Sequence, residues 1–456
     1  MGRLVAISNR TAADAASRAG GLAVAVWESL KTTGGMWFGW SGDLTTEPSK
    51  RVTSVMDEGV SFILTDLTRD EYDGYYLDYA NSVLWPVFHY RVDLASFDRD
   101  AFETYFSVNR RIAGLVAERL EPSDTVWVHD YHFLLMGDAL RQAGWSGAIG
   151  FFLHIPFPSP EIFKALPEHR QIARAMAAFN VIGLQSAGDR ANLVRYLVEE
   201  AEGEDLGDDY VRAFGRTVRI SAYPIGIDAE GFAEAAKSEE ANEAISRIGR
   251  FLGDRELVIG VDRMDYSKGL PERFEAVGTL FDDYPETRGN VHVTQIAPPS
   301  RSKVEEYREL RETLDGLAGR INGDYGDLDW IPLRYLARSY DRQELAGLFR
   351  IARCGLVTPL RDGMNLVSKE FIMAQDAEDP GVLILSEFAG AAEQLTDALI
   401  VNPHDTSKVA DTINQAITMP LEERQARWKT LRDIVVSQDI SWWRKRFLSD
   451  LEQVQV

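Results

Sequence analysis

Short β-branched apolar runs alternate along the chain with Gly-containing turns and longer amphipathic stretches. This alternation is typical of α/β units with parallel sheets. Buried strands are predicted at 4–8, 125–128, 149–153, 257–261, 291–296, 355–358 and 382–385. Helical periodicity predicts helices at 102–120, 170–179 and 271–283. We therefore expect an α/β protein with doubly wound sheets.

Both periodicities break at 223–228, where Pro224 and Gly226 follow one another closely. The acidic stretch 199–209 just before this break is predicted to be a solvated loop. A chain of 456 residues exceeds the usual size of one domain. The sequence thus predicts two doubly wound domains of similar size, residues 1–226 and 227–439. The helical tail breaks near Asp439, and we expect about 440–456 to pack back on the first domain.

Composition narrows the class of partners. The chain holds 49 Lys and Arg against 71 Asp and Glu, a net charge of −22, which argues against nonspecific binding to nucleic acid or an anionic membrane. No apolar run is long enough for a membrane span, and the first residues lack a signal-peptide pattern, so we expect a cytoplasmic location. Cys354, the one cysteine, excludes a disulfide framework and fits a reducing compartment. We expect it to be buried.

Polar residues gather where the first-half strands end, which is where doubly wound domains bind ligands. Arg10 follows the first strand, and Gly20 and Gly21 precede a predicted helix, a weak phosphate signal that a plain turn explains equally well. The histidines of 129–132 and His154 invite a metal interpretation, but neighbouring side chains point in different directions, so no shared ion is expected. Asp130 is better suited to binding hydroxyls and His154 to hydrogen-bonding a sugar. The aromatic side chains form either a sugar platform or plain core: Trp37, Trp40, Tyr75, Tyr76 and Trp85.

The second half repeats this pattern with more cations. Arg263 and Lys268 follow the strand at 257–261 and are placed to clamp a diphosphate. Arg301 follows the next strand. Residues 363–366 open a helix whose free N–H groups suit an anion, Glu370 on that helix suits a ribose diol, and Asp362 at the turn suits sugar hydroxyls. Asp327 and Asp329 form an Asp-x-Asp pair, but chance matches are common among 71 acids, so no metal role is expected.

These motifs, taken in order, resemble the trehalose-6-phosphate synthase family, the retaining glycosyltransferases of family 20. The resemblance covers essentially the whole chain. Its most specific pieces are 37–42, 83–86, 129–132, 151–158, 265–269 and 361–370.

The resemblance implies the GT-B fold, in which two Rossmann-like domains face a central cleft. The first domain would bind the acceptor and the second the nucleotide sugar. The implied reaction transfers glucose, with retention, from a nucleoside-diphosphate glucose to glucose-6-phosphate and forms α,α-trehalose 6-phosphate, the first step of trehalose synthesis. UDP-glucose is the favoured donor. No metal or other cofactor is implied, the partners are these two small molecules, and a homo-oligomer (dimer or tetramer) is left open.

The resemblance also implies residue roles. Arg10 and Arg301 would hold the acceptor phosphate together with Tyr76, Trp85 would line the pocket, and Asp130 would bind the acceptor sugar. The implied donor-binding residues are Gly20, Gly21, Arg263, Lys268, Tyr340, Asp362, Gly363, Met364, Asn365, Leu366, Val367 and Glu370. The implied catalytic residues are Asp130, His154, Arg263, Lys268 and Asp362. Tyr340 stands where many members carry Phe, which leaves the donor base open among UDP, ADP and GDP.

In the family's front-face reaction, the leaving phosphate itself takes the acceptor's proton, so retention needs no carboxylate nucleophile. Three alternatives remain: a glucosylglycerol-phosphate synthase, a pseudo-glycosyltransferase of the same fold, and an inactive sugar-phosphate sensor. The acceptor set around Arg10 favours glucose-6-phosphate, and the intact Arg263, Lys268 and Glu370 argue against a sensor.

Overall fold

The computed structural model describes residues 2–11, 23, 26–27, 29–31, 34–48, 52–300 and 305–454. The chain divides into two compact units, Met1–Pro224 with Trp443–Val456, and Ile225–Trp442. The boundaries expected from the sequence were 226 and about 440. In the described part of the chain, no helix is both long enough and apolar enough to cross a membrane.

The first unit is built on one sheet in which the described residues form ten strands. Their order is β3-β4-β2-β1-β5-β6-β7-β10-β9-β8. All neighbours pair parallel except at the two edges, where β3–β4, β10–β9 and β9–β8 are antiparallel. The bounds are β1 Leu4–Arg10, β2 Met36–Thr45, β3 Thr53–Asp57, β4 Val60–Thr68, β5 Thr125–His129, β6 Ile149–Phe152, β7 Val181–Leu184, β8 Glu204–Gly207, β9 Tyr210–Ala213 and β10 Arg216–Ala222.

The loop predicted at 199–209 is wrong in part, because Glu204–Gly207 form strand β8. All four residues of β8 are exposed, as the acidic composition indicates. Their backbone nevertheless pairs with β9, and Glu204 forms an ion pair with Arg212 at 3.0 Å. A polar sequence predicts solvent exposure, but it does not distinguish a loop from an exposed edge strand.

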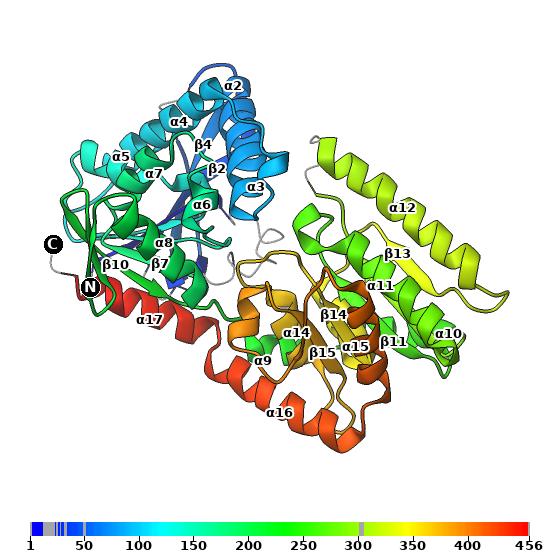
Figure 1. Cartoon of the computed structure of the whole chain (residues 1–456). Coiled ribbons are helices and arrows are strands. Elements are labelled where there is room, and N and C mark those ends of the chain that lie inside the picture. Colours follow the sequence, from blue (N-terminus) through cyan, green and yellow to red (C-terminus); the bar gives the residue numbers. More distant parts are fainter. Residues whose placement is uncertain are drawn as a thin grey trace. The chain divides into compact units, whose positions relative to one another are not determined.

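Helices cover both faces of this sheet (Figure 1). The helical segments are α2 Arg69–Glu71, η2 Tyr72–Leu84, α3 Trp85–Phe88, η3 Val92–Leu94, α4 Arg99–Ala117, η4 Tyr131–Phe133, α5 Met136–Gln142, α6 Pro160–Phe163, α7 His169–Met176, α8 Ala187–Glu199 and α17 Ile440–Glu452. Helix α4 begins three residues before its predicted start, because Asp98 caps it by accepting the Asp100 N–H at 2.8 Å. Segment η2 is a π-helix, a form that is common at functional sites.

Helix α17 completes the first unit after the chain has left and returned. Its Trp443 and Phe447 are fully buried, one helical turn apart. The Phe447 ring lies 5.0 Å from that of Trp127 on β5. A Cβ at Gly150 of β6 would come within 2.8 Å of Phe447, so glycine makes room for this helix. The predicted return of the tail to the first domain therefore has a packing basis.

The second unit is built on a parallel sheet in which the described residues form six strands, in the order β13-β12-β11-β14-β15-β16. Renumbered within the unit this is 3-2-1-4-5-6, the order of dinucleotide-binding folds. The strands are β11 Glu256–Val261, β12 Val291–Ile296, β13 Leu333–Leu336, β14 Cys354–Val357, β15 Val382–Ser386 and β16 Leu399–Val401. The helical segments are α9 Ala229–Ala235, α10 Glu239–Leu252, η5 Tyr266–Lys268, α11 Leu270–Asp283, η6 Pro285–Thr287, α12 Glu305–Tyr325, α13 Arg342–Ile351, α14 Leu366–Ala374, η7 Gly390–Glu393, α15 Thr406–Thr418 and α16 Leu421–Ser437.

The central strands β12, β14 and β15 are buried along their whole length, as expected for a parallel sheet covered on both faces, although β12 carries the polar residues His292, Thr294 and Gln295. The predicted strand at 291–296 is confirmed without change. The strand predicted at 355–358 begins one residue earlier, at Cys354. The Cys354 side chain is buried, as expected, and burial raises the pKa of its thiol.

Candidate functional site

Each sheet has a switch point, where successive connections leave in opposite directions. In the first unit it lies between β1 and β5, and in the second between β11 and β14. Open α/β sheets bind their ligands outside the carboxyl ends of the strands at such a point. Arg10 ends β1 and Asp130 follows β5, while Arg263 and Lys268 follow β11 and Asp362 follows β14. The topology thus gathers most of the predicted residues at two places.

At the switch point of the second unit, Lys268 meets the start of helix α14. Its Nζ lies 2.5 Å from Oδ2 of Asp362, and both side chains are largely buried. Asn365 donates its Nδ2–H to the same oxygen at 3.1 Å. Asn365 also caps α14, because its Oδ1 accepts the Ser368 N–H at 3.1 Å. One ammonium group and the positive end of a helix dipole therefore lie together, which suits an anion.

The position of Lys268 is fixed by the turn that carries it. Asp265 accepts the Ser267 N–H at 3.0 Å, and Tyr307 donates its hydroxyl to the other Asp265 oxygen at 3.0 Å. Gly269 adopts φ +63°, and a Cβ there would come within 2.5 Å of the Thr358 carbonyl oxygen. The cation is thus preorganised, which is the condition for strong electrostatic stabilisation of developing charge.

The other predicted donor residues follow strands β11 and β13 of the same sheet or lie on α14 and in the turn before it. Arg263 is exposed at the end of β11. Glu370 is half-buried on α14, and burial raises its pKa to about 7. Tyr340 follows β13, and its hydroxyl accepts the Arg338 Nε–H at 2.8 Å. Gly363, Met364 and Asn365 are buried, and Leu366 and Val367 are half-buried.

At the switch point of the first unit, Asp130 and two histidines come together. The Asp130 Oδ1 accepts the His154 N–H at 3.3 Å, and His154 Nε2 lies 3.2 Å from His129 Nδ1. Burial lowers the pKa of His154 to about 3 and that of His129 well below its usual value, so both rings are neutral at neutral pH. Asp130 has φ 74° and ψ 167°, a conformation that non-glycine residues rarely adopt. Strain of this kind is typical of functional sites.

Beside this group, Arg10 stands over an aromatic cluster. Its guanidinium lies 4.8 Å from the centre of the Trp40 ring. Tyr72 and Tyr76, one turn apart on η2, stack at 5.3 Å, and Tyr76 stacks on His132 at 5.8 Å. Trp85 is buried, with its ring 5.6 Å from that of Tyr131.

For Trp37 and Tyr75, the structure decides between the two roles left open by the sequence, a sugar platform or plain core. Trp37 and Tyr75 are each only 1% exposed. Trp37 donates its Nε1–H to Ser8 at 2.8 Å, and Tyr75 donates its hydroxyl to Asn9 at 3.0 Å. Both therefore belong to the core. Tyr72 and His132 were missed as members of the aromatic cluster, although Tyr72 lies four residues before Tyr76, the spacing of neighbours on one helix face.

Three predicted residues, Gly20, Gly21 and Arg301, lie outside the described residues. Within the described ranges, no three His, Cys, Asp or Glu side chains are grouped as metal ligands. Asp327 instead closes a turn, because its Oδ1 accepts the Leu328 N–H at 2.7 Å. Asp329 lies 3.5 Å from Arg255.

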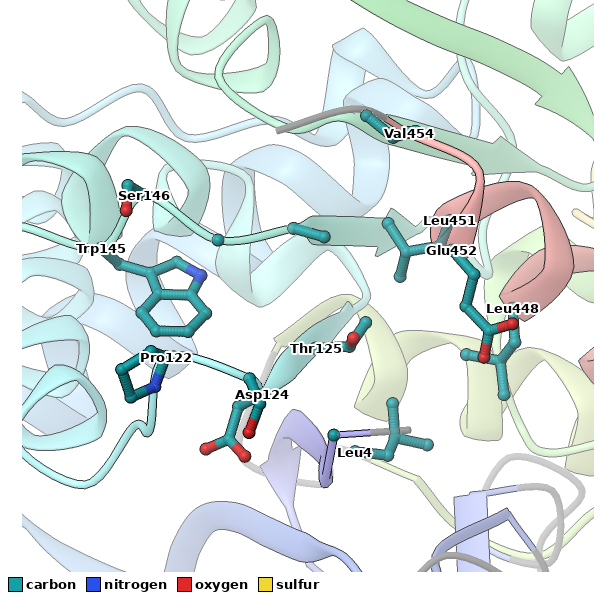
Figure 2. A pocket seen from close by; sticks show the side chains of 14 residues that line it. Leu4, Pro122, Asp124, Thr125, Trp145, Ser146, Leu448, Leu451, Glu452 and Val454 are labelled. Atoms are coloured by element: carbon teal, nitrogen blue, oxygen red, sulfur yellow. The ribbon is translucent and has the colours of Figure 1, made fainter.

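A separate cavity of about 540 Å³ lies at the opposite edge of the first sheet, where β1 and β5 begin (Figure 2). Trp145 and Pro122 lie on one side of it, and Leu448 and Leu451 of α17 lie on the other. Its buried carboxylate, Asp124, is already paired with Arg3 at 2.7 Å. Within the first unit, the cavity therefore lies at the opposite ends of β1 and β5 from the switch point.

Sequence reasoning missed a buried polar network behind Lys268. Arg273 on α11 donates to Asp262 at 2.7 Å, to Gln295 at 2.8 Å and to Thr358 at 2.9 Å. The available signal was its place on the apolar face of a helix, between Leu270 and Phe274, where a charge needs a partner.

Two doubly wound units, with polar side chains gathered at the switch point of each, define an α/β protein of the GT-B class of glycosyltransferases. The model of glycosyltransferase family 20 matches residues 5–453. The chain belongs to that family.

Individual relatives agree over the full length. A trehalose-6-phosphate synthase of Klebsiella pneumoniae subsp. pneumoniae is 45% identical over 458 residues, which cover 100% of this chain and 96% of the relative. An alpha,alpha-trehalose-phosphate synthase (UDP-forming) of Burkholderia xenovorans, solved in complex with glucose-6-phosphate, has a TM-score of 0.95 at 46% identity, covering 99% of this chain and 100% of that one. A trehalose-6-phosphate protein from E. coli, bound with UDP-2-fluoro glucose, has a TM-score of 0.96 at 43% identity, covering 99% of each chain.

Proposed function

We propose that the chain transfers glucose from UDP-glucose to glucose-6-phosphate with retention, forming α,α-trehalose 6-phosphate and UDP. The observation that carries this is the cluster of Lys268, Asp362 and Asn365 at the start of α14, on the nucleotide-fold switch point. Relatives named as UDP-forming synthases, and solved with glucose-6-phosphate or a UDP-glucose analogue, support it. Both substrates are cytoplasmic metabolites, so we place the reaction in the cytoplasm.

The donor half of the reaction belongs to the second unit. Breaking the bond between the sugar C1 and the phosphate oxygen leaves negative charge on the departing diphosphate. Lys268, Arg263 and the N–H groups that open α14 are placed to stabilise that charge. Asp362 holds Lys268 in position and has a role in holding the donor glucose. Glu370 is suited to the ribose diol.

The acceptor half belongs to the first unit. Arg10, held over Trp40, is suited to the phosphate of glucose-6-phosphate, with Tyr76 beside it. Asp130 accepts hydrogen bonds from sugar hydroxyls. His154 is neutral, so it hydrogen-bonds a sugar hydroxyl without adding charge.

Bond making and breaking balance without a protein nucleophile. The acceptor hydroxyl forms the new bond to C1 on the face that the diphosphate leaves. Its proton passes to the departing phosphate oxygen, so the configuration is retained. We propose that no metal takes part, since Lys268 and Arg263 supply the positive charge.

The first test is a product assay on the purified full chain. We expect UDP-glucose with glucose-6-phosphate to give trehalose 6-phosphate and UDP, detected by mass spectrometry, with turnover retained in EDTA. Parallel reactions use ADP-glucose and GDP-glucose as donors and glycerol-3-phosphate as acceptor. Absence of the disaccharide phosphate with every donor would refute the proposal, and faster transfer to glycerol-3-phosphate would reassign the acceptor. Loss of activity in EDTA that Mg²⁺ restores would overturn the metal-free mechanism.

A second prediction concerns Arg10. Arg10→Ala should raise KM for glucose-6-phosphate by about 10- to 100-fold, because charge-assisted hydrogen bonds contribute roughly 1.5–3 kcal/mol. KM for the donor should change little. Arg110→Ala is the matched control, since this exposed arginine also lies over an aromatic ring, that of Phe106 at 5.6 Å. Equal effects on both KM values in steady-state assays would remove Arg10 from the acceptor site.

A further inference from the structure

A lysine is buried one turn inside the helix of the donor site. Lys369 on α14 is 1% exposed, between Ser368 and Glu370. Its Nζ donates to the carbonyl oxygen of Ile225 at 2.7 Å and to Oε1 of Gln394 at 2.8 Å. These bonds hold α14 to segments far away in the sequence, in addition to its packing against α9, α13 and α16. Figure 1 shows α14 with α9 and α16 beside it.

Both partners lie beside places where the chain passes from one unit to the other. Ile225 is the first residue of the second unit. Gln394 donates onward to Oε1 of Gln438, which comes four residues before the chain leaves that unit at Trp442.

The two passage segments, 225–227 and 438–440, are also joined directly. The Ile440 N–H donates to the Ile227 carbonyl oxygen at 3.0 Å. A Cβ at Gly226 would come within 2.3 Å of the Asp439 carbonyl carbon, so only glycine permits this approach. Lys369 thus binds one segment itself and reaches the other through Gln394.

We propose that Lys369 is a positioning residue, which couples nucleotide-sugar binding at the start of α14 to the two passage segments. This inference rests on the proposed function for the identity of the donor. The connection runs along one short helix, from the cap at Asn365, which would meet the phosphates, to Lys369 four residues later.

Stability alone gives a poor reason for a lysine here. Burial lowers the pKa of Lys369 to about 7, which reflects the cost of placing an amine in the interior. Methionine has a similar length and would fill the same space without that cost. A neutral amine still has two N–H groups, which match the two acceptors. The lysine supplies bonds to both passage segments that an apolar side chain lacks.

Lys369→Met tests the coupling, with exposed Lys429→Met on α16 as the matched control. We expect Kd for UDP, measured by calorimetry, to stay within about threefold, since the contacts at Asn365 remain. Turnover should fall at least about tenfold, because kcat requires both substrates in one complex. Deuterium exchange in peptides covering 225–228 and 438–441 should become faster.

A second variant makes the test independent of how well the first folds. Gln438→Leu removes the hydrogen bond at the far end of the network and should lower kcat without raising Kd for UDP. The double variant should lose no more turnover than Lys369→Met alone, because both substitutions break the same hydrogen-bonded connection. Full turnover in Lys369→Met, or additive losses in the double variant, would overturn the inference. Exchange rates and UDP binding need no product, so wild type that makes no trehalose 6-phosphate would refute the proposed function separately.

Discussion

Lys268→Ala is expected to lower kcat for glucosyl transfer by about 10²- to 10³-fold, the usual effect of removing one preorganised group that stabilises transition-state charge. The lysine is fixed 2.5 Å from Asp362 in a largely buried position, so water replaces it poorly. KM for glucose-6-phosphate should stay nearly constant. Initial rates over a range of both substrates measure this, and Arg263→Ala should act in the same direction.

The control must separate loss of the cation from exposure of Asp362. Lys408→Ala, at an exposed position of the same unit, should leave the rate unchanged. The double variant Lys268→Ala with Asp362→Asn should stay slow, because the leaving diphosphate still lacks its cation. Recovery in that double variant would mean that Lys268 serves only to neutralise Asp362. Activity within a few-fold of wild type in Lys268→Ala would contradict the mechanism.

Arg273→Met is expected to lower the free energy of unfolding of the second unit by about 3–5 kcal/mol, the cost of leaving a buried charge without its partner. Arg273 is buried and satisfies Asp262, Gln295 and Thr358 at once. Methionine fills much of the space and satisfies none of them. Urea unfolding followed by circular dichroism, fitted for the second unit, gives the change.

The matched variant removes both charges. Arg273→Met with Asp262→Leu should be less destabilised than the single change, since no buried carboxylate is stranded. Arg288→Met, a half-exposed arginine just after α11, should cost much less. A loss under about 1 kcal/mol in Arg273→Met would mean that the buried network does not stabilise the second unit as expected.

Features that depend on residues close together in the sequence were predictable, whereas contacts between residues far apart in the sequence were not. The strand at 257–261 was predictable because a continuous apolar run needs no knowledge of its neighbours, and the strand at 291–296 because its β-branched residues favour strands. The position of Arg263, Lys268 and Asp362 at the carboxyl edge of the sheet was predictable, because they follow predicted strands and parallel strands end at one edge.

Partnerships between remote residues were not predictable. Arg273 meets Asp262 and Thr358, and Lys369 meets Ile225, only after the sheet has brought α11 and α14 into place. Edge strand β8 was missed because its polar residues pair through the backbone alone. Trp37 and Trp40 lie three residues apart on one strand and are both buried, and only the packing reveals that Trp40 contacts the Arg10 guanidinium.

Because α17 is synthesised last and packs on the first unit, it determines the order in which the two units can complete their folding. Residues 225–442 form one compact unit from a continuous stretch, whereas the first sheet lacks Trp443 and Phe447 until after that stretch has been synthesised. On the ribosome, the second unit can therefore fold before the first is complete. Until Phe447 has been synthesised, the surface at Gly150 and Gly183 that it packs against remains exposed. A nascent chain arrested before residue 443 should present this apolar surface to chaperones, although its second unit is already complete.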